Sequence, residues 1–255
     1  MHNADIRRQA IALINRGFSL REVSTSTGIP RSTLRDWRSH PETAASRAVC
    51  ARCSTPPVLP EPQADYAYLL GLYLGDGCIS LAGARNKAVW KLRIMCADAW
   101  PGLQQECAQA MSSIRTDNKV RMQQRPGCAE VNSCSRHWPC LFPQHGPGKK
   151  HLRHIELTSW QRTIVNGNPG RLARGLFHSD GYRGVNRVRA QLVTGDRWYE
   201  YPRYIFTNES VDILRLCADA LDRLGVEWRF SRRNAISVAR RDAVARLDEF
   251  VGPKY

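Results

Sequence analysis

The sequence has no run of about eighteen apolar residues and no secretory leader near its start. The first absence argues against a membrane-spanning helix, and the second argues against secretion. The nine cysteines are an odd number, which together with the lack of a leader argues against a secreted disulfide framework. We therefore expect a cytoplasmic protein with no membrane partner.

Acidic residues are scarce relative to basic ones. The 255 residues include 38 Lys plus Arg against 23 Asp plus Glu, which gives a net charge of +15, and only six of the basic residues are lysine. An excess of arginine alone is compatible with GC-rich coding, so the positions of the basic residues are more informative than their number. A strongly basic surface favours a nucleic-acid partner.

Two short segments, 71–77 and 175–181, have nearly the same sequence. Each reads glycine, leucine, aromatic, any residue, small residue, aspartate, glycine. Small residues four positions apart form a stripe along which two helices can approach closely. Asp76 and Asp180 would then lie at the last helical positions, each followed by a glycine that can take the left-handed conformation.

This placement is electrostatically unfavourable for two carboxylates. The C-terminal end of a helix is partially negative and neighbouring aspartates repel, so at least one pKa should rise. A bound divalent cation would remove both penalties, because hard cations prefer carboxylate oxygens. The alternative is that each aspartate only begins an Asp-Gly turn, but two matched segments favour the metal site.

Segments 69–77 and 173–181 resemble the nine-residue motif that names the LAGLIDADG homing endonucleases. Single-chain members carry two such helices in one pseudo-symmetric α+β fold, each half ordered αββαββα. The resemblance implies that Asp76 and Asp180 bind Mg²⁺ or Mn²⁺ and are the catalytic acids of a DNA endonuclease. The segments depart from the motif at three positions, none of which removes an acid: Leu74, Arg174 and His178.

The same resemblance suggests further site residues, although no motif fixes their alignment. Asp98 and Asn208 are 110 positions apart and end predicted strands, where the family keeps water-positioning polar residues. Lys150 resembles a basic residue that the family places near the scissile phosphates. His178, beside the second motif, is expected to pack or to support the site rather than to bind metal.

Other segments support a duplicated unit. The stretch 106–111 mirrors 216–221 at an offset of 110, whereas the motif aspartates are 104 positions apart. About six extra residues therefore fall in the second half, and we place them in a hairpin within 185–204, where added length is tolerated.

Four predicted strands alternate basic or amide residues with apolar ones. Alternate residues of a strand point to opposite faces, so each strand should have one basic and one apolar face. The apolar sets are Leu92 with Ile94, Val120 with Met122, Val188, and Trp228 with Phe230. A solvated charged face usually mixes signs, but these strands contain little acid. Because Arg, Lys and Gln contact base edges and phosphates, the predicted DNA-contacting residues are Lys91, Arg93, Lys119, Arg121, Gln123, Arg125, Arg187, Arg189, Arg203, Arg229 and Arg233.

Residues 20–37 resemble a helix-turn-helix of the resolvase and transposase type. Gly28 permits the tight turn, and a preceding helix is expected at 6–16. The inward-facing side chains would be Val23, Ile29, Leu34 and Trp37. The recognition helix would present four residues to the major groove: Arg31, Ser32, Thr33 and Arg35. A helical hairpin used for protein contact is the alternative.

Five prolines between residues 41 and 63 indicate a partly extended linker. We therefore predict a helix-turn-helix domain at 1–40, a linker at 41–63 and a two-repeat domain at 64–255. The halves of the repeat would span about 64–165 and 166–255.

Two cysteine clusters have spacings that occur in zinc sites. Cys50 and Cys53 form half of such a site, without a second pair nearby. The other cluster consists of Cys134, His137, Cys140 and His145. Free cysteine also packs as a small hydrophobe, and we favour that interpretation over zinc in both places.

Together these features predict a monomeric, site-specific protein that binds double-stranded DNA and cleaves it with Mg²⁺ or Mn²⁺. A non-cleaving transcriptional regulator is the main alternative, because LAGLIDADG folds also occur in bacterial sporulation regulators that carry a helix-turn-helix. An RNA maturase is disfavoured by the operator-type helices. We expect a location in the bacterial cytoplasm, at the nucleoid.

Overall fold

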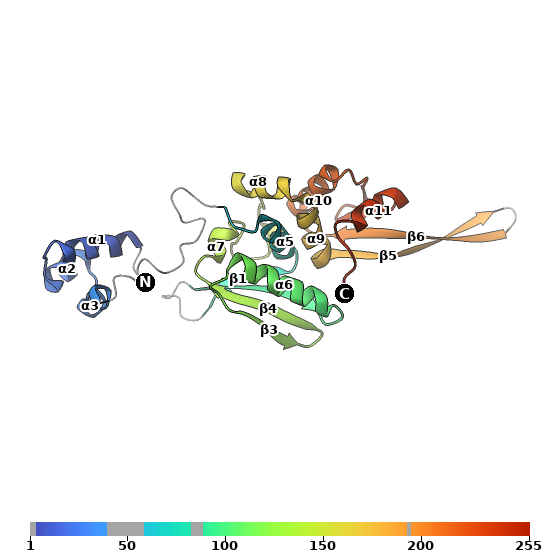
Figure 1. The fold of residues 1–255 in the computed structure, drawn as a ribbon. Coiled ribbons are helices and arrows are strands. Elements are labelled where there is room, and N and C mark those ends of the chain that lie inside the picture. Colours follow the sequence, from blue (N-terminus) through green and yellow to red (C-terminus); the bar gives the residue numbers. More distant parts are fainter. Residues whose placement is uncertain (1–3, 40–58, 83–88, 193–194) are drawn as a thin grey trace.

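The computed structural model describes four stretches of the chain (Figure 1): residues 4–39, 59–82, 89–192 and 195–255. Most of the predicted linker, together with Cys50 and Cys53, lies outside these residues. Within them, no helix is long and apolar enough to cross a membrane.

The first described stretch forms three short helices: α1 (Ala4–Asn15), α2 (Leu20–Thr27) and α3 (Arg31–Ser39). A capping box starts α2, because the Ser19 hydroxyl accepts from the Glu22 N–H while the Glu22 carboxylate accepts from the Ser19 N–H. Gly28 has φ 69° and ends α2 in the left-handed conformation. The inward residues predicted from the sequence are buried together: Val23, Ile29, Leu34 and Trp37.

The larger part of the chain repeats one order of elements twice. The first half contains α5 (Gln63–Leu74), β1 (Gly77–Leu81), β2 (Trp90–Ala97), α6 (Pro101–Ile114), β3 (Val120–Arg125), β4 (Cys128–Ser135) and α7 (Trp138–Leu141). The second half contains α9 (Pro169–Asp180), β5 (Gly181–Leu192), β6 (Gly195–Thr207), α10 (Val211–Arg223), β7 (Arg229–Arg232), β8 (Ala235–Val238) and α11 (Arg241–Asp248). A 3₁₀ turn, η2 (Lys150–Leu152), and α8 (Ser159–Gly167) lie between them. The predicted αββαββα order is confirmed in both halves.

Each half has a four-stranded antiparallel sheet with the same strand order. The first sheet runs β1-β2-β4-β3 and the second runs β5-β6-β8-β7. Leu92 and Ile94 of β2 are buried beneath the helices, and Tyr204 and Phe206 of β6 are their counterparts in the second sheet. One face of each sheet is thus committed to the core.

Helices α5 and α9 pack side by side at the centre of the two halves (Figure 1). The close approach depends on glycine: a Cβ on Gly71 would lie 2.7 Å from the carbonyl oxygen of Leu172 and from the amide nitrogen of Leu176. A Cβ on Gly175 would collide with the carbonyl oxygen of Tyr68. The predicted small-residue stripe is confirmed, and we call this contact the seam.

The glycines that follow the two aspartates have a different role from the predicted one. Neither is left-handed, since Gly77 is the first residue of β1 and Gly181 has φ −97° and ψ 159°. Each is needed because a Cβ would lie 2.5 Å from the Cα of an aromatic residue four positions earlier, Tyr73 or Phe177. The chain passes directly from helix into strand at Gly181, and after a two-residue turn at Gly77.

The extra length of the second half lies where it was predicted. The first hairpin runs from Gly77 to Ala97 and the second from Gly181 to Thr207, which makes the second six residues longer. Strands β5 and β6 stay paired without a break from Gly181 to Leu192 and form a ribbon that extends beyond the rest of the fold (Figure 1).

Candidate active site

The two motif aspartates approach each other at one end of the seam. Asp180 is the last residue of α9, whereas Asp76 follows α5 by two positions and still donates its N–H to the carbonyl of Leu72 at 3.1 Å. The Asp180 carboxylate is so close to α5 that a Cβ on Gly75 would lie 3.0 Å from Asp180 Oδ2. One carboxylate from each half therefore reaches the same place.

This crowding weakens both acids. Loss of hydration, followed by the charge of Asp180, raises the pKa of Asp76 to about 6 although its side chain still contacts solvent. Loss of hydration also raises the pKa of Asp180, against the lowering effect of a hydrogen bond from Asn208. The electrostatic penalty predicted from the sequence is thus present at this site.

Two lysines cap the helix ends beside the acids. Lys150 Nζ donates to the carbonyls of Tyr73 at 2.6 Å and Gly77 at 2.9 Å, and also to that of Gly75. Burial lowers the pKa of Lys150 to about 8. These contacts bring Lys150 next to the first motif.

The second lysine, Lys254, was missed by the sequence analysis. Lys254 Nζ donates to the carbonyls of Ser179 at 3.2 Å and Gly181 at 2.8 Å, and burial lowers its pKa. Lys254 follows Lys150 by 104 positions, the offset that separates the two aspartates. Each half therefore supplies one carboxylate and one ammonium group.

The pair Asn208 and Asp98 does not act symmetrically. Asn208 follows β6 and donates from Nδ2 to Asp180 Oδ2 at 2.7 Å. Asp98 follows β2 in the equivalent place, but the side chain that contacts it is Gln124 of β3. Asn208 therefore touches the acidic pair, and no described contact links Asp98 to Asp76.

His178 is buried in the seam, and its two ring nitrogens contact groups other than the acids. Its Nδ1 lies 3.0 Å from Tyr68 Oη and its Nε2 lies 3.2 Å from the carbonyl oxygen of Val251. Burial lowers its pKa to about 4, so the imidazole is neutral at physiological pH. This agrees with the predicted packing or supporting role.

In the first sheet, the predicted basic residues share one face. The register places Lys91 and Arg93 of β2 on the face opposite the buried Leu92 and Ile94. The same face carries the predicted β3 residues, which are Arg121, Gln123 and Arg125. Lys119 lies just before β3 and joins Lys91 and Arg121 in lining a hollow of 330 Å³.

In the second sheet, the predicted faces are only partly correct. Arg203 and Arg229 lie on the face opposite the core, but the unbroken register puts Arg187 and Arg189 on the face of the buried Tyr204. In β5 the basic face is therefore on the core side of the sheet, and Val188 is on the open side. A period of two identifies which residues share a face but not which face is buried.

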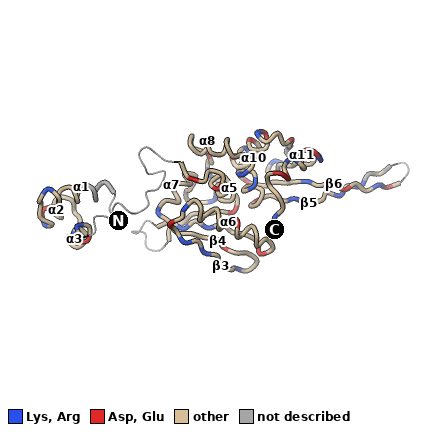
Figure 2. The backbone as a smooth tube through the Cα atoms, in the orientation of Figure 1, with Lys and Arg blue, Asp and Glu red and all other residues tan. Residues whose placement is uncertain are grey.

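Two expected apolar faces are also less buried than predicted. Met122 is 55% exposed and Phe230 is 52% exposed, and both lie on edge strands, β3 and β7. Arg233 lies in the turn after β7, near Glu209 at 3.5 Å. Figure 2 shows basic positions along β3 and along the β5–β6 ribbon.

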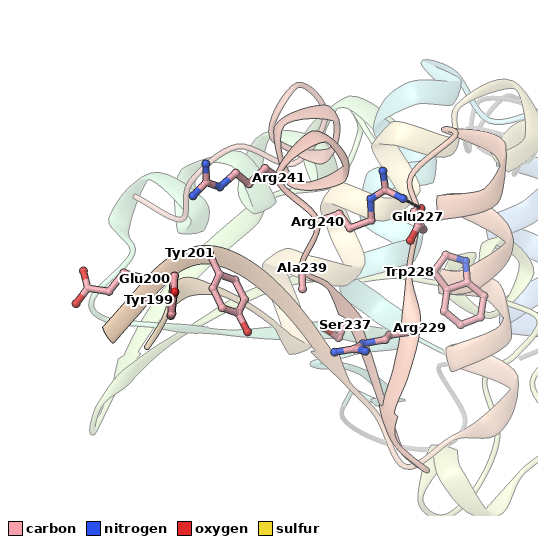
Figure 3. Close-up of a pocket in the computed structure, with 10 residues that line it drawn as sticks. All are labelled: Tyr199, Glu200, Tyr201, Glu227, Trp228, Arg229, Ser237, Ala239, Arg240 and Arg241. Atoms are coloured by element: carbon pink, nitrogen blue, oxygen red, sulfur yellow. Dashed lines mark hydrogen bonds and ion pairs between the residues drawn. The ribbon is translucent and has the colours of Figure 1, made fainter. Parts of the chain in front are cut away.

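A pocket of 510 Å³ opens where β6 extends past the end of β8 (Figure 3). It is lined on one side by Tyr199, Tyr201, Arg229 and Ser237, which lie on the same sheet face as Arg203. An ion pair between Arg240 and Glu227, 2.7 Å long, closes its other side. The pocket therefore belongs to the open face of the second sheet and lies apart from the acids.

The second group with zinc-like spacing, Cys134, His137, Cys140 and His145, does not form a metal site. Over the described residues, no three His, Cys, Asp or Glu side chains come close enough to hold a metal ion together. Cys134 is exposed on β4, whereas His145 packs edge-on against Trp90 at 4.9 Å. Cysteines 96, 107 and 217 are buried in the core as free thiols, as small hydrophobes would be.

On the recognition helix α3, Arg31, Ser32 and Arg35 are exposed and Thr33 is partly exposed. Their side chains thus lie on the surface of the three-helix unit. The family model of the homeodomain-like domain matches residues 1–45. None of the curated proteins matches the chain.

The chain is similar in structure to solved LAGLIDADG homing endonucleases. I-DmoI in complex with DNA and Ca is 15% identical, with a TM-score of 0.48 over 75% of this chain and 91% of that chain. I-AabMI bound to uncleaved DNA is 12% identical, with a TM-score of 0.45 over 72% and 82%. I-SmaMI bound to cleaved DNA is 10% identical, with a TM-score of 0.41 over 71% and 79%.

Proposed function

We propose that this protein binds double-stranded DNA at a specific site and cleaves it in a divalent-metal-dependent reaction. The observation that carries the proposal is the seam itself. Asp76 and Asp180 meet there, one from each half, and Lys150 and Lys254 flank them. A quasi-twofold arrangement of this kind suits a substrate with two antiparallel strands.

The acidic pair fits a hard divalent cation such as Mg²⁺ or Mn²⁺. The carboxyl groups of Asp76 and Asp180 both have raised pKa values. A bound cation would stabilise their ionised forms, because it offsets both the repulsion and the lost hydration. Two protein carboxylates with the remaining positions left to water and phosphate oxygens is a common arrangement for Mg²⁺. When bound, the metal would activate water and stabilise the leaving oxygen.

Residues of the chain would position the phosphates and orient the acids. The ammonium groups of Lys150 and Lys254 hold the ends of α5 and α9 and place positive charge beside the phosphates. The amide of Asn208 orients the Asp180 carboxylate through its 2.7 Å hydrogen bond. Asp98 lies at the matching strand end, and we assign it a weaker role.

DNA would lie across the open faces of the two sheets. In this proposal, phosphates and base edges are contacted by Lys91, Arg93, Lys119, Arg121, Gln123, Arg125, Arg203, Arg229 and Arg233, while Arg187 and Arg189 contact DNA only from the far side of the ribbon. The exposed residues of α3 would read a second stretch of major groove: Arg31, Ser32, Thr33 and Arg35. We place this activity in the cytoplasm, at the nucleoid.

The test begins with selection of bound fragments from randomised duplex DNA. The selected DNA is then incubated with the protein and either Mg²⁺ or EDTA. We expect tight binding in both and cutting or nicking only with Mg²⁺. Replacement of Arg93 and Arg121 by alanine should weaken binding. It should also reduce the slope of log K against log salt concentration by the amount expected for the loss of up to about two phosphate contacts. The same change at Arg187 and Arg189 should matter less.

The three-helix unit is the observation that favours a second candidate, a non-cleaving transcriptional regulator. Its homeodomain-like family match and exposed α3 residues would suit operator binding. Binding without scission in Mg²⁺ or Mn²⁺ would favour the regulator over the nuclease. Preference for RNA over duplex DNA in competition would favour a maturase.

A further inference from the structure

Four polar side chains meet behind the acids, where α6, α5 and α9 come together. Tyr68 Oη lies 3.0 Å from His178 Nδ1, and the Arg174 guanidinium donates two hydrogen bonds of 2.8 Å to the Glu106 carboxylate. The His178 side chain is fully buried. We call Tyr68, Glu106, Arg174 and His178 the seam cluster.

Two members of the seam cluster bind the same backbone oxygen. The Val251 carbonyl accepts a hydrogen bond from Arg174 Nη1 and lies 3.2 Å from His178 Nε2. A carbonyl can only accept, so Nε2 carries the proton of the neutral imidazole and Nδ1 accepts from the Tyr68 hydroxyl. Every polar atom of the imidazole is thereby used.

Val251 begins the short segment that carries Lys254. At the other end of this segment, the Leu103 N–H donates to the carbonyl oxygen of Tyr255 at 3.1 Å. The Tyr255 ring also packs so closely on Gly102 that no Cβ would fit there. The segment is therefore held before and after Lys254 by side chains and backbone outside it.

The positions that the repeat makes equivalent to the seam cluster, two in each half, contain no polar residue. The repeat offsets of 104 and 110 match the four residues of the seam cluster with four leucines: Leu172, Leu216, Leu70 and Leu74. All four leucines are part of, or packed against, the apolar core. Leucine is thus sufficient for packing at these places, whereas burying polar groups carries a cost. We infer from this cost that the four polar residues of the seam cluster do more than fill the core.

We propose that the seam cluster is a positioning device for Lys254. By fixing the Val251 carbonyl, it sets the start of the segment so that the Lys254 ammonium reaches the carbonyls of Ser179 and Gly181 beside Asp180. Lys150 needs no such cluster, because it is itself the first residue of the 3₁₀ turn η2. The consequence for DNA cleavage rests on the proposed function, but the placement of Lys254 does not.

The test compares the acetylation rates of individual lysines by peptide mass spectrometry. His178→Leu introduces the residue that the first half has at this place. We expect Lys254 to be acetylated roughly fivefold faster in this variant, the factor that corresponds to one lost hydrogen bond. The rate at Lys150 should be unchanged, which makes it the internal control. His178→Gln retains an N–H donor and should restore slow acetylation of Lys254.

Each outcome bears on the proposal. An unchanged acetylation rate at Lys254 would overturn the proposal. An equal increase at Lys150 would also overturn it, because a general loss of stability raises the acetylation rates of both lysines. If His178→Leu does not fold, Arg174→Lys replaces it, since a lysine keeps the charge beside Glu106 but cannot also reach Val251. Selective acceleration of Lys254 in that variant supports the proposal, and its absence contradicts it.

A second arm separates this proposal from the proposed function. If the wild type cuts DNA, His178→Leu should bind DNA as tightly but accumulate nicked product, because only the strand served by Lys254 is slowed. Equal slowing of both strands would contradict a role through Lys254. If the wild type does not cut, the acetylation result alone decides the placement, and the nuclease proposal fails separately.

Discussion

Asn208 donates a hydrogen bond to Asp180 across 2.7 Å, and this contact distinguishes the two halves of the site. Its counterpart Asp98 is held by Gln124 instead. We therefore expect Asn208→Ala to slow cleavage of one strand about tenfold, in line with the loss of a charge-assisted hydrogen bond.

The matched control for that variant is Asp98→Ala, which should slow cleavage less. A plasmid assay that resolves nicked from linear product measures both. Equal effects of the two variants, or no accumulation of nicked plasmid with Asn208→Ala, would contradict the asymmetry.

Lys150 is expected to stabilise the fold as well as to serve the site. Lys150→Met leaves three carbonyls without their donor and should lower the free energy of unfolding by about 1–3 kcal/mol. Lys149→Met, at the exposed neighbour, should change it by less than about 0.5 kcal/mol. Urea unfolding of both variants checks this, and equal stabilities would show that the carbonyl contacts contribute nothing.

The seam predicts a strong effect of one methyl group. In Gly71→Ala the new Cβ would lie 2.7 Å from backbone atoms of α9, so the helices must separate at a cost of about 2–3 kcal/mol. Gly167→Ala, at the end of α8, meets nothing within 4 Å and should be neutral or slightly stabilising. Thermal unfolding would show a lower Tm for the first variant only; two similar values would refute the close contact.

The acidic pair also predicts how stability depends on pH without metal. Because the pKa of Asp76 is about 6 in the folded protein and 3.8 ordinarily, the folded state binds the proton more tightly. The contribution of Asp76 to stability therefore falls as pH rises from about 4 to about 6. Asp76→Asn removes this loss, and in EDTA it should exceed wild-type stability above pH 6 by about 1 kcal/mol, a value reduced for solvent contact.

Denaturant unfolding at pH 4, 6 and 7.5 would measure that difference. Near pH 4 the two proteins should be nearly equally stable. Asp219→Asn, at an exposed position of α10, serves as the control and should follow the wild type throughout. A stability gain that is independent of pH would assign the effect to something other than the titration of Asp76.

The sequence predicted the seam well because its determinants are local and periodic. Small residues at Gly71 and Gly175 recur with helical spacing, and their steric effect does not depend on distant parts of the chain. The offset of 110 between Cys107 and Cys217 similarly located the equivalent helices of the two halves, α6 and α10, where both thiols are buried.

Lys254 escaped prediction although a signal was present. Gly148 and Gly252 are 104 positions apart, each lies two residues before its lysine, and both have positive φ, 75° and 67°. A glycine and a lysine at a fixed offset are too short a match to stand out. Only the fold brings both lysines to the helix ends.

Two further features are harder to predict from the sequence: which face of a strand is buried, and the seam cluster. The alternation around Val188 was correctly read, but which side of the ribbon continues into the core depends on the pairing of Arg183 with Tyr204. The seam cluster joins residues from three helices and a distant carbonyl. No local pattern relates Glu106 to Arg174 or His178.

Scission of selected DNA fragments by the wild type and by Asp76→Asn and Asp180→Asn, each in Mg²⁺ and in EDTA, tests the central claim most directly. The account predicts cutting or nicking by the wild type in Mg²⁺ alone, and intact DNA with both variants, which still bind it. Metal-dependent scission that survives in either variant, or tight binding by the wild type without any scission, would contradict it.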